Sequence, residues 1–408
     1  MPRSQAGLIL LLGSMTGLGA VAGDIYLPSL PEVMADLGTS REWVQATITA
    51  TMLGGAAGQL VIGPLSDRYG RRQPVLVGLA LHVAASIGII FTPSITLLIG
   101  LRFFQGVGNA SAGVVAMAII RDLRSGSRAA KLLSQLMLVI GVAPLFAPTI
   151  GTALAGLGTW RYAFVFLAVV GIGLGAVVWR RVPDTRSDEV KQVATGLGAA
   201  FRAYGRLLRD YRFMGYALIP GLAQSAMMAW VISSPFLVRT AYGRAATVFA
   251  LIFALCGVFM VIGAQVNAAL VYRFKPKALL LVALPVELAL AVAGLALTLV
   301  GWGGLWGLVA GVAALLFMSG MVPANASALA LSRHGEASGA ASALIGTTQL
   351  GFTALVMSLL SLLGDSQHEM VAVQAAVLAV ALGIVLAGGG YRRRPDRRLG
   401  RGEPRPTL

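Results

Sequence analysis

Apolar runs of about 20 residues follow one another along almost the whole chain, with short polar connections between them. An α-helix needs about 20 apolar residues to cross the hydrocarbon core of a bilayer, which is roughly 30 Å thick. We count twelve runs of this kind, at residues 7–28, 43–65, 74–92, 94–120, 131–156, 160–180, 213–238, 246–270, 277–299, 302–328, 338–363 and 369–390. The pattern therefore predicts an all-α polytopic membrane protein with twelve transmembrane helices.

The longest polar stretch divides the twelve runs into two sets of six. The predicted organisation is a six-helix bundle at 1–180, a linker at 181–212, a second six-helix bundle at 213–390 and a basic tail at 391–408. Within the linker, Arg202, Arg206 and Arg209 are spaced to share one face of a helix. We expect this linker to lie along the headgroups of anionic lipids.

A weak internal repeat indicates that the two sets of helices are related. Each set has a short basic turn between its second and third helices, preceded by Gly63 in the first set and by Gly263 in the second. Two related helical halves that meet at the bilayer midplane are the usual architecture for alternating access. Most glycines lie within the apolar runs, where small residues let helices approach and slide past one another.

Composition and charge agree with a membrane location. The chain is 57% hydrophobic and 12% charged, which leaves too few charges to cover a water-exposed surface. The net charge of +16 could suggest a nucleic-acid partner, but the basic residues concentrate in alternate connections between apolar runs. Nucleic-acid binding is therefore excluded. By the positive-inside rule, both termini and the linker are expected in the cytoplasm of a bacterial cell, with the helices in its inner membrane.

The N-terminus has some features of a cleavable signal peptide. Arg3 precedes an apolar run that begins at Leu8, and residues 20–22, Ala-Val-Ala, would form a possible cleavage site. We reject this interpretation because eleven further spans follow, and cleavage would separate the first helix from Asp24.

Cysteine and histidine are too scarce and too scattered for an enzyme. Cys256 is the single cysteine, so no intramolecular disulfide can form and thiol chemistry is not expected. His82, His334 and His368 fall in a span and in two connections on different sides of the membrane. No catalytic or metal-binding cluster is predicted.

The most specific local pattern is residues 63–72, Gly-Pro-Leu-Ser-Asp-Arg-Tyr-Gly-Arg-Arg, where one helix ends and the chain reverses. An acidic side chain there can face an arginine or a helix N-terminus, and a glycine permits the reversal. The segment resembles the signature loop of the major facilitator superfamily, which is held to act as a conformational switch. The defining positions are Gly63, Asp67, Arg68, Gly70, Arg71 and Arg72. An ordinary basic turn would not match at so many positions.

A second pattern, residues 102–108, places Arg102 inside the fourth span. A buried guanidinium is costly unless it has partners, so an intramembrane arginine is a candidate functional residue. The segment resembles the Arg-x-x-Gln-Gly motif of proton-coupled members of the superfamily. Alternatively, Arg102 extends to the membrane surface as a structural anchor.

The fifth span contains a third pattern, which resembles the motif associated with antiporters. Its positions in this chain are Gly141, Pro144, Pro148 and Gly151. The match is partial because the family pattern closes with two glycines, whereas Thr152 follows here. The motif favours antiport without settling it, since any kinked transmembrane helix can contain glycine and proline.

Taken in order and spacing, the whole chain resembles the Bcr/CflA group of twelve-span drug:proton antiporters, which export bicyclomycin, chloramphenicol and related compounds. The segments that carry this resemblance are residues 23–31, 59–67, 102–108, 323–325 and 337–344, together with Gln349. The resemblance implies that Asp24 binds the coupling proton and that Arg102 modulates it. A carboxyl group holds a proton more readily when buried, and a nearby cation opposes this. The alternative is that Asp24 only caps its helix or lies at the interface.

Several polar and aromatic residues are candidates for a substrate cavity, because they lie on spans expected to line it. They are Tyr26, Gln59, Gln105, Asn109, Gln224, Trp230 and Gln349. Any one of them can instead serve only packing. Glu287 is the other carboxylate well inside a span, and no family motif includes it; a structural or lipid-adjacent role is expected.

The predicted function is secondary active transport: proton-coupled efflux of small amphiphilic drugs, with multidrug resistance as the result. No Gly-x4-Gly-Lys-(Ser/Thr) loop is present to bind ATP, so a proton gradient and no cofactor is expected to drive transport. The expected partners are the drug or metabolite, protons and membrane lipids, and the protein is expected to be a monomer. The alternative is a proton symporter that imports a small metabolite on the same fold.

Overall fold

The structure is a computed structural model that describes residues 5–123, 146–182, 185–186, 197–332, 338–364 and 366–389. Two of the predicted antiporter-motif residues, Gly141 and Pro144, lie outside the described residues, and so does the predicted basic tail at 391–408. Every regular element in the described ranges is helical.

The first half begins with a long apolar helix that is followed by two short ones. Its elements are α1 (Gln5–Asp24), the 3-10 turn η1 (Leu27–Ser29), α2 (Leu30–Asp36), α3 (Arg41–Tyr69), α4 (Arg72–Ile90), α5 (Ile95–Leu123), the apolar helix Phe146–Ala155 and α7 (Tyr162–Arg181).

A helix from the linker, α9 (Leu197–Arg209), precedes the second half. The elements of that half are α10 (Tyr211–Phe236), the π-helical turn η2 (Leu237–Ala241), α11 (Ala246–Leu270), α12 (Pro276–Val300), α13 (Gly304–Ser319), α14 (Val322–Leu331), α15 (Ser338–Leu363) and α16 (Gln367–Gly389). The predicted tenth span is interrupted, because α13 and α14 are separated by a turn at Gly320 and Met321.

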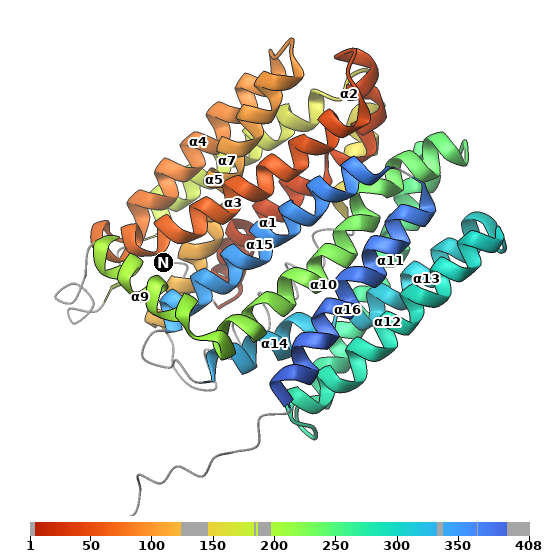
Figure 1. The fold of residues 1–408 in the computed structure, drawn as a ribbon. Coiled ribbons are helices and arrows are strands. Elements are labelled where there is room, and N and C mark those ends of the chain that lie inside the picture. The colour runs from red at the N-terminus through yellow and green to blue at the C-terminus, as the bar shows by residue number, and fades with distance from the viewer. Residues whose placement is uncertain are drawn as a thin grey trace, which may run out of the picture.

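The described ranges contain eleven helices that are long and apolar enough to cross a membrane, and the shorter helix Phe146–Ala155 covers the end of the fifth predicted span. The prediction of an all-α polytopic protein is confirmed. The long helices run alongside one another as a bundle, with α2 at one end and α9 at the other (Figure 1). We refer to these as the α2 end and the α9 end.

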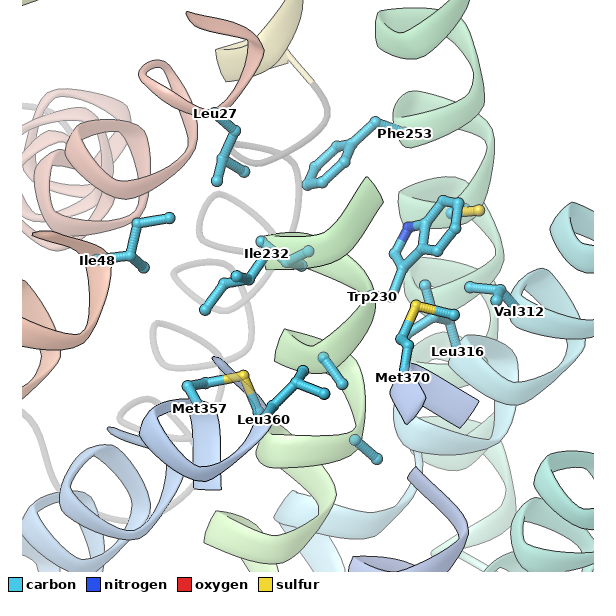
Figure 2. Packing of buried hydrophobic residues seen from close by; sticks show 14 of the residues in the cluster. Leu27, Ile48, Trp230, Ile232, Phe253, Val312, Leu316, Met357, Leu360 and Met370 are labelled. Atoms are coloured by element: carbon cyan, nitrogen blue, oxygen red, sulfur yellow. The ribbon is translucent and has the colours of Figure 1, made fainter. Parts of the chain in front are cut away.

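The two halves meet along α3 and α15. The Thr347 hydroxyl donates a hydrogen bond to the Ala56 carbonyl oxygen at 3.2 Å, and the Leu350 side chain lies against Gly55. One apolar cluster extends across both halves: Figure 2 shows Leu27 and Ile48 of the first half facing the side chains of the second. Because lipid is as apolar as these side chains, close packing rather than water exclusion holds such helices together.

At the α2 end the halves are also joined by polar contacts. The Arg239 guanidinium lies 2.7 Å from the Glu32 carboxylate and donates a hydrogen bond to the Pro28 carbonyl oxygen. The Arg41 guanidinium carbon lies 4.2 Å from the centroid of the Phe236 ring. These contacts close the α2 end between the two halves.

The linker contains a helix, as the arginine spacing predicts. Tyr204 and Leu207 of α9 are buried, and the Tyr204 hydroxyl donates a hydrogen bond to the Leu60 carbonyl oxygen at 3.1 Å. The three arginines Arg202, Arg206 and Arg209 are exposed on the same helix. The basic face of α9 is thus available to headgroups while its apolar face packs on the α9 end of the bundle.

Helices α3 and α5 pack backbone to backbone at two reciprocal glycines. A Cβ added to Gly54 would lie 1.9 Å from the Phe103 carbonyl oxygen, and one added to Gly106 would lie 2.0 Å from the Thr51 carbonyl oxygen. Neither distance leaves room for a side chain. The close approach of these helices therefore depends on glycine at both positions.

Helices α11 and α13 repeat this arrangement in the second half. A Cβ added to Gly263 would lie 1.8 Å from the Phe317 carbonyl oxygen, and one added to Gly320 would lie 2.3 Å from the Met260 carbonyl oxygen. In both halves each glycine lies three residues after the residue of its own span whose carbonyl oxygen faces the glycine of the partner helix.

These contacts define a structural correspondence between the fourth and tenth spans, in which Phe103 matches Phe317 and Gly106 matches Gly320. The sequence repeat pairs Gly263 with Gly63, whereas in these helix contacts the counterpart of Gly263 is Gly54.

Candidate functional site

Asp24 is the last residue of α1, at the α2 end of the first span. Its side chain is half-buried, and no hydrogen bond or ion pair reaches it from any residue that the structure describes. A carboxyl group without a fixed partner is free to gain or lose a proton without breaking other contacts.

Arg102 lies on α5 and is fully buried. Its Nη1 donates hydrogen bonds to the Gln105 Oε1 at 2.6 Å and to the Ala22 carbonyl oxygen at 3.1 Å. The guanidinium carbon lies 5.1 Å from the centroid of the Tyr26 ring and 5.7 Å from that of Phe164. The guanidinium therefore does not extend to the membrane surface, and the interpretation of Arg102 as a surface anchor is wrong.

The Arg102 guanidinium contacts one face of α1, and the Asp24 side chain projects from another face of the same helix. Ala22 and Tyr26, which contact the guanidinium, are four residues apart and share one face of the chain's helical path. Asp24 lies between them in sequence, so its side chain projects from the opposite face. The structure shows no ion pair between Asp24 and Arg102. An influence of Arg102 on Asp24 stays a prediction, and it would act across α1.

A chain of buried polar contacts continues from Arg102 to the third span. Gln105 Nε2 donates a hydrogen bond to the Ser86 hydroxyl at 2.8 Å, and Ser86 in turn donates to the His82 carbonyl oxygen at 2.7 Å. The His82 ring lies 3.3 Å from the Leu167 carbonyl oxygen. Sequence reasoning missed Ser86 in this network. Its spacing of four residues from His82, on one face of the third span, is the signal that could have found it.

The fifth-span motif reaches the first span directly beside Asp24. A Cβ added to Gly151 would lie 1.9 Å from the Ile25 carbonyl oxygen. Pro148 lies one turn earlier in the same short helix, Phe146–Ala155. The glycine therefore lets the fifth span press on the chain at the residue after Asp24.

The predicted switch loop is organised around Arg71, which is buried between α3 and α4. Its guanidinium donates to Asp67 at 2.5 Å and to the Ser66 hydroxyl at 2.8 Å. It also forms a bidentate pair with Asp122 at the end of α5, at 2.8 and 3.0 Å. Burial alone would lower the pKa of Arg71, but its hydrogen bonds to Asp122 and Asp67 raise that pKa above the ordinary value.

The same loop is bonded to the chain that follows α7. Arg186 Nη1 donates to the carbonyl oxygens of Asp67 and Arg68, at 2.8 and 2.9 Å, and the Thr185 hydroxyl donates to Asp122 at 2.7 Å. Gly70 has a φ of 94°, which permits the reversal predicted from the sequence. Asp122 was not among the predicted residues, because it lies 51 residues from Arg71 and no local pattern marks it.

Three predicted cavity residues lie in the interior of their own half. Tyr26 packs edge-on against Trp160 and Phe164, and Gln105 belongs to the Arg102 network. Trp230 is buried in the second half, beside Val312, Leu316 and Met370 (Figure 2). In this conformation all three side chains pack inside a helical bundle, and their contact with a substrate stays a prediction.

The other four predicted cavity residues are half-buried. Gln349 Nε2 donates to Gln224 Oε1 at 3.4 Å, between α15 and α10. The Gln59 amide covers Gly346 of α15, and a Cβ at Gly346 would lie 1.7 Å from Gln59 Oε1 unless that side chain moved. Asn109 is half-buried and faces Gly19 of α1.

Glu287 lies on α12 and is fully buried, so it does not face lipid as a lipid-adjacent role would require. One carboxyl oxygen shares a hydrogen bond with the Ser319 hydroxyl of α13. A groove between α12, α13 and α16 lies toward the α2 end and includes Tyr242 and Trp302 in its lining. None of the predicted site residues lines that groove.

Comparison with known proteins agrees with this architecture. The family model of the Major Facilitator Superfamily matches residues 10–357. The chain is 34% identical over 363 residues to the uncharacterized MFS-type transporter YdgK of Bacillus subtilis, covering 88% of this chain and 90% of that protein. It is 29% identical over 381 residues to a bicyclomycin resistance protein homolog of Haemophilus influenzae, covering 93% of this chain and 95% of the relative.

The fold is also similar to that of a solved transporter. The xylose transporter XylE of E. coli, in a partially occluded inward open conformation, matches with a TM-score of 0.75. The match covers 93% of this chain and 96% of that one, at 13% sequence identity. At this identity the likeness concerns the fold alone.

Proposed function

The chain belongs to the major facilitator superfamily, and from this premise we propose that it is a proton-driven exporter of small amphiphilic drugs. It is a multi-pass transporter of the bacterial inner membrane and not an enzyme. The name of the bicyclomycin resistance protein homolog supports export of an antibiotic-like compound as the direction and substrate class.

The observation that carries the proposal is the state of Asp24. Its carboxyl group is half-buried at the end of the first span, and no described residue holds it in a hydrogen bond or ion pair. When the transporter opens outward, Asp24 takes up a proton and the affinity for the drug falls. When the transporter opens inward, Asp24 releases the proton and the drug binds. The two ligands thus use the site alternately, which is antiport.

A proton gradient provides the free energy for this cycle. Each proton that moves down a potential of 100 mV contributes about 2.3 kcal/mol. The chain has no nucleotide-binding loop of the Gly-x4-Gly-Lys-(Ser/Thr) type, so no ATP is required. No cofactor takes part in the proposed mechanism.

The contacts between the halves indicate which interactions must separate when the transporter opens to each side of the membrane. With the orientation expected from the positive-inside rule, the α2 end faces outward. Opening to the outside then requires the Arg239–Glu32 ion pair and the contact between Arg41 and Phe236 to separate. Opening to the inside separates α3 from α15 near Ala56 and Thr347.

A transport assay in inverted membrane vesicles tests the proposal. A drug-susceptibility panel in a host without its own efflux pumps first identifies a transported compound, with chloramphenicol as the starting probe. Vesicles made acidic inside should accumulate that compound through the wild-type protein. Asp24→Asn should lose proton-driven accumulation while the protein is still inserted and folded.

Glu42→Gln is the matched control, because Glu42 is a carboxylate at the aqueous start of α3 and should have little effect. Full accumulation by Asp24→Asn would refute the assignment of the proton to Asp24. Accumulation only in right-side-out vesicles that are acidic outside would instead show a symporter.

A further inference from the structure

The two halves place polar side chains at corresponding positions of the fourth and tenth spans. Gln105 lies two residues after Phe103, and Ser319 lies two residues after Phe317, the residues matched by the reciprocal glycine contacts. Gln105 bonds to Ser86 of the third span, and Ser319 bonds to Glu287 of the ninth. In each half a polar side chain that lies two residues after the matched phenylalanine thus bonds to the preceding span, to Ser86 in the first half and to Glu287 in the second.

Glu287 differs from Ser86 in being titratable in an environment that offers no counter-charge. Its side chain is fully buried, and its Oε2 has no hydrogen-bond partner in the described part of the chain. The packed helices α13 and α14 contain no titratable residue, and those of α16, His368 and Glu369, lie in its first turn. On α12 itself, Lys277 is ten residues away, which is about 15 Å along the helix.

An ionised carboxylate at this position would have one hydroxyl donor and no cation. Buried charges without partners are strongly unfavourable, and such a group takes up a proton instead. The neutral acid form fits the surroundings described for Glu287, with Ser319 as its single hydrogen-bond partner.

The hydrogen bond between Ser319 and Glu287 is made at the break in the tenth span. Ser319 is the last residue of α13, and α14 begins three residues later at Val322. Beyond the break, Asn325 Nδ2 donates to the Met321 carbonyl oxygen at 2.8 Å and to Asn267 Oδ1 at 2.6 Å. Side-chain hydrogen bonds thus hold the two segments on both sides of the turn.

We propose that Glu287 is a second proton-binding site, in the half opposite Asp24, whose proton is exchanged with water when the break between α13 and α14 moves. On release, the proton passes from the carboxyl group to water, and the carboxylate that remains accepts the Ser319 hydroxyl hydrogen bond. The charge left beside the break then favours a conformation that admits water. The timing of this exchange within a transport cycle rests on the proposed function, but the site itself does not.

Infrared difference spectroscopy on the full chain in lipid nanodiscs tests the site without any substrate. Asp24→Asn is used as the background, so that the other intramembrane carboxyl group is removed. The carbonyl stretch of a protonated carboxyl group should be present at neutral pH, shift in heavy water and disappear as the pH rises. Adding Glu287→Gln should abolish the band, and Glu287→Asp should retain it at a shifted frequency.

Glu369→Gln is the matched control, because Glu369 also bonds to a serine hydroxyl, that of Ser366, but at the α2 end. That variant should leave the band unchanged. A band that neither shifts in heavy water nor responds to pH while the protein stays folded would show a permanently neutral structural acid and overturn the proposal. So would a band that survives Glu287→Gln. A negative result here leaves the Asp24 transport assay unaffected, so the two proposals fail separately.

Discussion

Arg102 and Glu287 are buried ionisable groups, one basic and one acidic, in opposite halves of the molecule, and their surroundings differ. Arg102 has two oxygen acceptors and two aromatic faces around its guanidinium. Glu287 has a single hydroxyl partner. Carbonyl oxygens and aromatic faces both stabilise a cation, so the first half is suited to keep Arg102 charged. The second half is suited to an acid that is neutral when buried.

The difference appears beside the residues that the reciprocal glycine contacts match. Arg102 directly precedes Phe103, and the corresponding residue of the tenth span is Leu316, which packs among apolar side chains (Figure 2). The first half therefore carries a fixed charge where the second has a hydrocarbon side chain. In the second half the partner of Ser319 is the titratable Glu287, whereas in the first half Gln105 bonds to the Ser86 hydroxyl. The two halves thus carry different polar groups beside similar helix contacts.

The largest effect is expected from the glycines that make the reciprocal backbone contacts in the two halves. Gly54→Ala and Gly263→Ala each place a Cβ within 2 Å of a backbone carbonyl oxygen that cannot move aside alone. Each should lower the free energy of unfolding by about 3 kcal/mol, the upper end of overpacking costs. Denaturant titration in detergent micelles measures this. Gly100→Ala and Gly173→Ala, which have open space at the Cβ position, should be close to neutral. Unequal losses at Gly54 and Gly263 would weaken the correspondence between the halves.

Arg102→Met should separate function from stability in the first half. Burying a charge is costly, and Arg102 Nε and Nη2 have no hydrogen-bond partner in the described part of the chain, so an apolar side chain should not lower the thermal unfolding midpoint. Proton-driven accumulation in inverted vesicles should fall roughly 5–150-fold, the range of typical coupling energies. Arg102→Lys, which keeps the charge, should retain more activity. Unchanged transport by Arg102→Met would show that the fixed charge has no role in coupling.

Ser319→Ala should destabilise the second half, because it removes the one hydrogen-bond partner of Glu287. The loss in the free energy of unfolding should be about 1–3 kcal/mol, the cost of leaving a buried polar group unsatisfied. Combining it with Glu287→Leu should restore most of the loss, since both polar groups are then absent. A double variant as unstable as the sum of the single ones would indicate that the two side chains act independently.

Ser86→Ala provides the matching change in the first half and should have the smallest effect. Removal of the Ser86 hydroxyl leaves one neutral donor, Gln105 Nε2, without a partner, while Gln105 Oε1 keeps its bond to Arg102. The expected cost is about 1 kcal/mol. The same denaturant titration compares it with Ser319→Ala. A cost equal to or larger than that of Ser319→Ala would contradict the expectation that an unpartnered neutral amide costs less than an unpartnered carboxyl group.

The order and extent of the helices could be predicted because they follow from local properties of the chain. The apolar length needed to span a bilayer is the same for every helix, so the eighth span, predicted at 246–270, is found at Ala246–Leu270. The interruption of the tenth span was missed, although Gly320 and Pro323 lie at the break and both residue types disfavour a continuous helix.

The sequence predicted some of the contacts between the candidate site residues. Arg102 and Gln105 do share one network, and Asp67 does face an arginine, because those pairs are three or four residues apart and a helix or tight turn brings them together. The relation of Asp24 to Arg102 was not predictable in this way. It depends on which face of α1 is turned toward α5, and the pattern of apolar residues does not mark a face when all sides of a helix are apolar.

By itself the sequence determined that this chain is a helical membrane protein of the major facilitator superfamily, with Asp24, Arg102 and Glu287 as its notable intramembrane charges. Only the tertiary structure decided what those charges contact. The partners of Arg71 and Glu287 lie 51 and 32 residues away, on other helices. A buried polar group takes its properties from such neighbours, because the bilayer interior offers it no water as an alternative partner.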